Sequence, residues 1–249
     1  MKRTIIFCLS ALLLLSSCEV TEGERHEPIN VGSGIVYWTN EHVTYITNTL
    51  ESLFIIDHYL ATDPALRQEE LGERAQGLVV EYNDTTNTIA VGHRYDSGTV
   101  YNYHNIVTDG RLLSEGGTWS IDKEAIVIAN TPDGMTATFD TSSPQDSQID
   151  AKLRIEEYRY VKGKRGFHLK YDGEIDVVTS GAYDYTLGID IRKSMEYGYI
   201  EGVGRGIVGG ELDVDYNYAA REEVDEVYMV YGNDGNINFS YRGYNVTTR

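Results

Sequence analysis

The stretch Asp184-Tyr185-Thr186-Leu187-Gly188-Ile189-Asp190-Ile191 alternates polar and apolar side chains with a period of two. The same alternation recurs in residues 211–218 and 236–241. Successive side chains of a β-strand point to opposite faces, so each stretch has one dry face and one wet, often acidic, face. This pattern is typical of antiparallel strands that are solvated on one side.

Short turn signals separate further strand-like stretches between Leu78 and the C-terminus. Asp-Gly pairs stand at Asp109-Gly110, Asp133-Gly134, Asp172-Gly173 and Asp234-Gly235. Such pairs favour short hairpin loops, and no long helical pattern intervenes that could connect parallel strands. We therefore predict a mainly β fold of about ten to twelve strands. The expected architecture is an antiparallel meander that forms a barrel-like or strongly bent sheet.

One amphipathic helix is expected before the strands, and a shorter one after it. Asn40 can cap the first helix, and Val43, Ile46, Leu50, Leu53 and Phe54 then recur at spacings of three and four. This pattern predicts a helix over about residues 40–61, which either packs on the dry side of the sheet or plugs one end of it. Asp63-Pro64 is typical of a new helix start, which predicts a second helix over about 64–76.

The N-terminus has the features of a secretory signal. Lys2 and Arg3 are followed by an apolar run from Ile5 to Leu15, about eleven residues long. That run is too short for a transmembrane helix, which needs roughly 20 apolar residues. Leu15-Ser16-Ser17-Cys18 then resembles a lipobox, the processing site of bacterial lipoproteins. The resemblance implies that residues 1–17 are removed and that Cys18 carries the lipid that holds the chain to a membrane.

An acidic, polar segment follows Cys18, and we expect residues 18–34 to form a flexible tether. It resembles the acidic stretch of Bacteroides-type exported lipoproteins, which implies an outer-membrane location, on either the periplasmic or the surface side. The strand-rich part of the chain, Leu78–Arg249, contains no linker-like stretch, and the domain is expected to span residues 35–249. We predict a single β-rich domain there.

Charge and cysteine content narrow the range of partners. The chain has 39 acidic and 21 basic side chains, and removal of Lys2 and Arg3 with the signal leaves a formal charge of −20. This balance disfavours nucleic acid, because phosphate binding needs clustered Lys and Arg. Cys8 lies in the signal and Cys18 would be lipidated, so the exported domain has no disulfide and must be stabilised by its core.

Tyrosine is unusually abundant, with 20 Tyr against 5 Phe and 2 Trp. Five Tyr-x-Tyr pairs would each share one face of a strand. The pairs at 183/185 and 216/218 fall in register with apolar residues and are expected in the core. The other three are candidate ligand-binding residues, because exposed tyrosines offer flat apolar area and a hydroxyl group: Tyr101, Tyr103, Tyr158, Tyr160, Tyr197 and Tyr199. Core packing is the alternative explanation for them.

The sequence contains no pattern typical of catalysis. The six histidines do not show zinc-ligand spacing, and no nucleophile elbow occurs. Asp213, Asp215 and Asn217 alternate on one strand face, but the sequence lacks the glycine and glutamate that an EF-hand requires. We therefore predict no catalytic residue, metal site or cofactor.

Three functions remain open on the sequence alone. The first is a non-enzymatic cell-envelope lipoprotein that binds a glycan, a peptide or an envelope protein through a sheet face or barrel mouth. The second is a structural or assembly component of the envelope, which predicts an exposed apolar patch or an unprotected edge strand. The third is a hydrolase on a β scaffold, which predicts acids or a histidine converging in a cleft.

Overall fold

The structure is a computed structural model, and it describes residues 26–66, 78–83, 88–94, 100–107, 112–121, 124–143, 147–161, 166–180, 184–200, 204–218 and 223–248. Within these residues the chain forms one long helix, a short 3₁₀ turn and a series of strands. The predicted signal and Cys18 lie outside the described residues, and so do residues 18–25 of the expected tether.

Thirteen strands form one antiparallel sheet in sequence order, so that each strand pairs with its neighbours in the chain. The strands are β1 (Leu78–Asn83), β2 (Thr88–Arg94), β3 (Val100–Val107), β4 (Gly117–Ile121), β5 (Glu124–Thr131), β6 (Gly134–Ser143), β7 (Ser147–Val161), β8 (Gly166–Thr179), β9 (Tyr185–Ile200), β10 (Gly204–Tyr218), β11 (Asp225–Tyr231), β12 (Ile237–Tyr241) and β13 (Tyr244–Thr248). The first and last strands do not pair with each other, so the sheet is an open meander. This confirms the predicted fold class, with one strand more than the upper end of the expected range.

The helix α2 spans His26–Ala61 and has 36 residues, so it begins fourteen residues before the expected start. Residues 26–34 are therefore helical and do not belong to a flexible tether. Pro28 is tolerated because it lies in the first turn, where its missing N–H needs no partner. Asn40, the expected cap, lies inside the helix.

Tertiary packing explains why the helix extends through a stretch that contains two glycines and a serine. A Cβ on Gly32 would lie only 2.9 Å from Cε2 of Phe239 and 3.0 Å from Cβ of Tyr241. Glycine therefore allows α2 to contact β12 closely. The low helix propensity of this residue is outweighed by the contact that its small size permits.

The expected second helix is described only at its start. The backbone N–H of Ala65 donates to Oδ1 of Asp63 at 2.9 Å, and Leu66 N–H donates to the Asp63 carbonyl at 2.8 Å. These bonds form a turn at Asp63–Leu66. The remainder of the predicted 64–76 helix lies outside the described residues.

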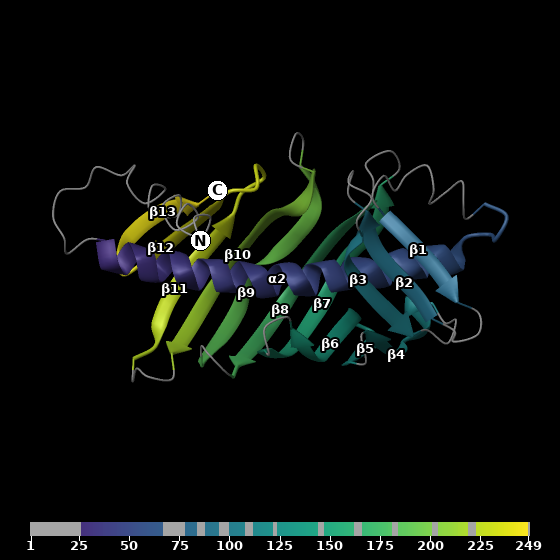
Figure 1. Ribbon diagram of the computed structural model, residues 1–249, viewed down its shortest axis with the longest axis horizontal. Helices are drawn as coiled ribbons and strands as arrows, with labels where there is room; N and C mark the ends of the chain where they lie inside the picture. Colours follow the sequence, from purple (N-terminus) through teal and green to yellow (C-terminus); the bar gives the residue numbers. More distant parts are fainter. Residues whose placement is uncertain are drawn as a thin grey trace, which may run out of the picture.

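The sheet curls around the helix, as Figure 1 shows. Strands β8–β13 lie behind α2 in this view, while β1 and β2 pass in front of its C-terminal half. The helix contacts β2 and β3 as well as β8–β13. Helix residues 49–56 are consequently buried all round. No helix in the described part of the chain is both long enough and apolar enough to cross a membrane.

Irregular pairing bends the central strands. The register shifts on β7–β8 between Ile155 and Glu157, and on β8–β9 between Tyr171 and Glu174. Gly173 has φ 137° there, and a Cβ at this position would collide with the carbonyl oxygen of Lys152. Such bulges increase local twist and bend the strand, which allows the sheet to wrap around a helix.

Candidate functional site

The concave side of the sheet is filled by α2, and tyrosine side chains connect the two. Four tyrosine hydroxyls from the sheet contact polar side chains of the helix, and all four rings belong to the buried core. The pairs are Tyr231 with Asn40 Oδ1 at 3.2 Å, Tyr185 with His42 Nε2 at 3.1 Å, Tyr171 with Thr47 Oγ1 at 2.7 Å, and Tyr197 with Glu51 Oε2 at 2.8 Å. Tyrosine can fill apolar space and still supply a hydroxyl group to a buried polar partner. This accounts for much of the tyrosine excess on the described strands.

The contact at Glu51, whose side chain is only 1% exposed, also includes an ion pair. Arg205 of β10 forms an ion pair with Oε1 of Glu51, and its guanidinium carbon lies 5.2 Å from the centre of the Tyr197 ring. Arg205 also donates to the carbonyl oxygen of Phe167 at 3.2 Å. Burial raises the pKa of Glu51, while Arg205 and the Tyr197 hydroxyl oppose this shift. The group joins α2 to β8, β9 and β10.

His42 and Tyr185 form a second buried polar contact. Burial lowers the pKa of His42 to about 4, so its imidazole is neutral near pH 7. Burial also raises the pKa of Tyr185 to about 12. A neutral histidine bonded to a protonated tyrosine is a packing contact without a group poised to transfer a proton near neutral pH.

The predicted ligand-binding tyrosines occupy three different environments. Tyr158 stacks on Phe54 with ring centres 4.3 Å apart, and Tyr160 stacks on His58 at 4.8 Å. Tyr197 is buried against Glu51, whereas Tyr199 is 45% exposed. These four residues therefore do not form one shared surface. Tyr101 and Tyr103 belong to β3, whose side chains are outside the described part of the structure.

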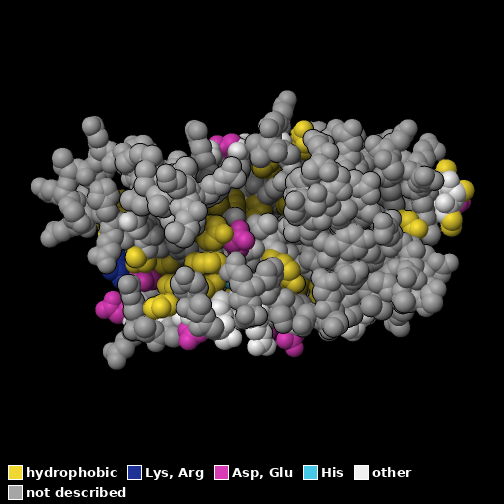
Figure 2. All heavy atoms as spheres, viewed as in Figure 1, with side chains coloured by type: hydrophobic (Ala, Val, Ile, Leu, Met, Phe, Trp, Pro, Cys, Tyr) yellow, Lys and Arg dark blue, Asp and Glu magenta, His cyan; other side chains and the backbone are white. Residues whose placement is uncertain are grey.

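Part of the helix carries aromatic side chains toward solvent. Tyr37 is 55% exposed and meets Trp38 edge to face, with ring centres 5.1 Å apart. Trp38 in turn lies 6.0 Å from the ring of Tyr185. Figure 2 shows hydrophobic side chains gathered in a hollow on the left half of this face. The Tyr37 ring is thus the exposed end of an aromatic cluster that also contains Trp38 and the buried Tyr185.

The outer face of the sheet carries a row of carboxylates across six strands. Direct cross-strand pairing joins Asp140 of β6 to Asp150 of β7, Asp150 to Asp176 of β8, and Asp215 of β10 to Glu226 of β11. Gly188 of β9 stands between Asp176 and Asp215. All five acids are exposed. Like charges in direct cross-strand register destabilise a sheet, so this row opposes folding and repels anions.

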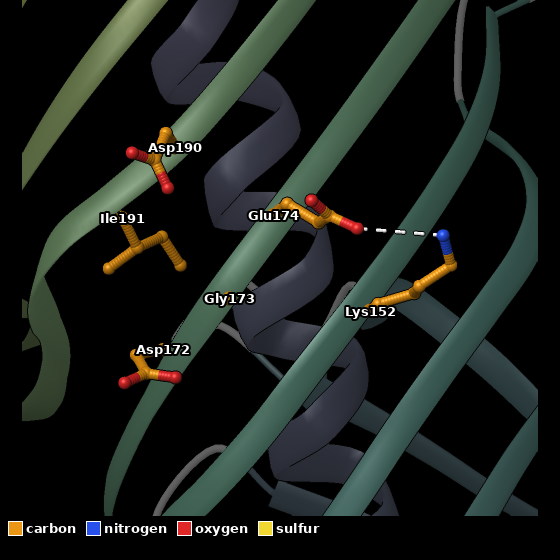
Figure 3. A pocket seen from close by; sticks show the side chains of 6 residues that line it. All are labelled: Lys152, Asp172, Gly173, Glu174, Asp190 and Ile191. Carbon is orange, nitrogen blue, oxygen red and sulfur yellow. Dashed lines mark hydrogen bonds and ion pairs between the residues drawn. The ribbon is translucent and has the colours of Figure 1, made fainter.

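A shallow depression lies beside this row, where the β8 bulge separates the strands. It is lined by Lys152, Asp172, Gly173, Glu174, Asp190 and Ile191. Figure 3 shows the side chains of Lys152, Asp172, Glu174 and Asp190 on the side of the sheet that faces away from α2, with the Lys152–Glu174 ion pair spanning 3.5 Å. Asp172 accepts a hydrogen bond from Arg154 at 2.5 Å. Two of the three acids are thus paired with cations, and the depression is open to solvent.

Neighbouring charges on the outer face form further ion pairs. Glu156 contacts Arg154 at 2.7 Å and Lys170 at 3.5 Å, and it accepts a hydrogen bond from Ser194 at 2.9 Å. Asp213, one of the acids considered for calcium, pairs with Arg192. Among the described residues, no group of three or more acids, histidines or cysteines is arranged to hold a metal ion.

Sequence reasoning missed Glu51 and Arg205 as a pair. The two residues are 154 positions apart, and Glu51 falls on the helix face that the apolar spacing marked as polar. A polar residue opposite the apolar stripe is ordinarily solvated. Here the sheet covers both sides of the helix, so the same residue is buried.

Comparison with known proteins finds no match to this chain among protein-family models, curated proteins or solved structures.

Proposed function

We propose that this chain is a non-enzymatic lipoprotein of the cell envelope that presents the outer face of its sheet to a partner. The observation that supports the proposal most directly is that helix α2 fills the concave side of the sheet. Helix α2 occupies the space where a barrel-like protein would hold a small ligand, and three of its buried polar side chains, His42, Thr47 and Glu51, are bonded to tyrosines. The broad surface that remains for recognition is the outer face.

The lipid anchor limits where the domain sits. Cys18 and His26 are eight residues apart, and an extended chain spans at most about 3.6 Å per residue. The start of α2 is therefore held within about 29 Å of a lipid on Cys18. Since Gly32 contacts Phe239, strand β12 lies close to the same end. If Cys18 carries the lipid, we expect the β12–β13 side of the sheet to lie nearest to the membrane.

The charge of the outer face bears on the partner. The row from Asp140 to Glu226 repels anionic lipid headgroups, so this face is expected to turn away from the membrane surface. A partner that binds there must be neutral or basic. An envelope protein meets this requirement better than an acidic glycan does.

The anchor is tested by replacing Cys18 with Ala in the full-length chain and separating membranes from soluble material. The protein with Cys18 should sediment with membranes, and the C18A variant should not. Continued sedimentation of C18A after a salt wash would show that the lipid assignment is wrong.

The binding face is tested separately by photo-crosslinking in intact cells. A photoreactive residue at Val178, which is 52% exposed on β8, should yield an adduct of higher mass. The same residue at Ile175, which is fully buried three positions earlier, serves as the matched control. Absence of any adduct from Val178 in the anchored protein would contradict the proposed use of the outer face.

A further inference from the structure

The residues of the edge strand β13 include none of the sequence features that commonly protect the edge of a sheet. Its residues are Tyr244, Asn245, Val246, Thr247 and Thr248, with no charge, no proline and no bulge in its pairing with β12. Exposed edges are normally blunted by lysine, proline or a bulge, because their unpaired backbone groups recruit other strands. The other edge strand, β1, contains Glu81.

The hairpin geometry identifies which backbone groups of β13 are free. Arg242 and Gly243 have φ values of 47° and 82°, as in a two-residue type I′ turn. Tyr241 and Tyr244 flank this turn and form a hydrogen-bonded pair, so Val246 and Thr248 also point their backbone groups toward β12. The N–H and C=O groups of Asn245 and Thr247 therefore point away from the sheet. No partner for these backbone groups occurs among the described residues.

We propose that β13 pairs with β13 of a second copy of this chain, antiparallel and centred on Val246. The free groups stand one residue to either side of Val246, so a two-fold axis at this residue brings Asn245 opposite Thr247 of the partner copy. Each such pair exchanges two hydrogen bonds, which gives four across the interface. Val246 then lies opposite its own copy as a non-hydrogen-bonded pair, with Cα atoms about 4.5 Å apart.

The side chains fit this pairing. Asn245 and Thr247 are exposed and polar on one face, and Tyr244 and Val246 are half-buried on the other. Residues 237–248 contain no acid, although the chain as a whole has 39. Arg242, the basic residue of this hairpin, is held by Asp225 at 2.7 Å. The edge is thus spared the repulsion that the carboxylate row would impose on two acidic molecules.

The symmetry also agrees with the membrane anchor. A two-fold axis perpendicular to the sheet places both copies of α2 on the same side of the continued sheet. Both lipid anchors then reach the same membrane, and this step, like the vesicle test below, rests on the proposed lipidation. A five-residue strand pair buries much less than the roughly 1,200 Å² typical of stable interfaces. Association is therefore expected at the membrane surface, where anchoring raises the effective concentration.

The proposal is tested with the full-length lipidated protein in phosphatidylcholine vesicles. After processing, Cys18 is the only cysteine and is lipidated, so Val246→Cys introduces a unique thiol. Mild oxidation should convert most of the V246C protein to a disulfide-linked dimer on a non-reducing gel, since the Cα separation suits a disulfide. The matched control is Val178→Cys, which is exposed on the outer face and should remain monomeric.

A second pair of variants distinguishes pairing of the two β13 strands from crosslinking by random collision of anchored molecules. Asn245→Pro, added to V246C, removes the outward N–H and should abolish the dimer, whereas Asn245→Ala keeps that N–H and should preserve it. Equal crosslinking of V246C and V178C would overturn the proposal, as would a dimer that survives N245P. A V246C adduct to a different protein in cells, without the homodimer, would also overturn it. None of these results depends on the partner proposed for the outer face.

Discussion

Replacing Arg205 with Met should destabilise the fold by leaving Glu51 without its charge partner. The Glu51 side chain is 1% exposed and Arg205 is 17% exposed, so the ion pair is largely shielded from water. Removing one member of a buried pair costs about 3–5 kcal/mol, because the remaining charge is uncompensated. The lost Phe167 hydrogen bond adds about 1 kcal/mol.

The assay is urea unfolding at pH 7, followed by far-ultraviolet circular dichroism. With a slope of about 3 kcal/mol/M, a total loss of about 4–6 kcal/mol lowers the midpoint by about 1.3–2 M. The effect should also depend on pH. Burial raises the pKa of Glu51 and Arg205 opposes this shift, so the pKa rises further in R205M. A carboxyl group whose pKa is raised on folding destabilises the folded state as pH increases above its unfolded pKa of about 4.3. The destabilisation of R205M relative to the wild type should therefore be smaller at pH 5 than at pH 7.

The double variant E51L/R205M provides the control. With both charges removed, apolar side chains of similar size fill the site, and stability should return to within about 1–2 kcal/mol of the wild type. If R205M and E51L/R205M are equally destabilised at both pH values, the two residues are not coupled and the reasoning is refuted.

Two further predictions concern the helix. Burial lowers the pKa of His42 to about 4, so the stability that its neutral form contributes above pH 6.5 is lost as pH falls toward 4, by up to about 3 kcal/mol. In the H42Q variant, the urea midpoint should therefore change less with pH over this range than it does in the wild type. An identical pH dependence in H42Q and the wild type would contradict this prediction. Gly32→Ala should lower the free energy of unfolding by about 1–3 kcal/mol through the Phe239 contact. Gly34→Ala, where nothing lies within 4 Å of the added Cβ, should instead raise the free energy of unfolding by about 0.5–1 kcal/mol. Equal effects of Gly32→Ala and Gly34→Ala in thermal unfolding would argue against the close packing of Gly32 on Phe239.

The sequence was sufficient to predict the antiparallel meander, because alternation is a local signal. Leu187 and Ile189 show it directly, and both are buried on β9 as their spacing predicts. The helix was predicted from Asn40, where its apolar pattern is regular. Its first fourteen residues escaped prediction because Gly32 and Gly34 have low helix propensity, and the contact that makes Gly32 useful involves Phe239, more than 200 residues away.

The role of the tyrosines was harder to infer for the same reason. Tyr197 and Tyr199 share a face in an ideal strand, but their different exposures in β9 show that alternation is interrupted at Gly198. A prediction based on two-residue alternation assumes that the alternation is unbroken, so it cannot locate such an interruption. Nor can it indicate that Tyr197 meets a glutamate, because that contact depends on how the sheet wraps around the helix.

Hydrogen exchange of the backbone amides of α2 tests most directly whether the helix fills the curved sheet. Residues 49–56 are buried all round, so their amides should exchange only through global unfolding and be the slowest in the helix. Amides around Tyr37, on the exposed face, should exchange sooner through local opening. Fast exchange over 49–56 under conditions in which β9 remains protected would show that the helix lies outside the sheet, and would contradict the account.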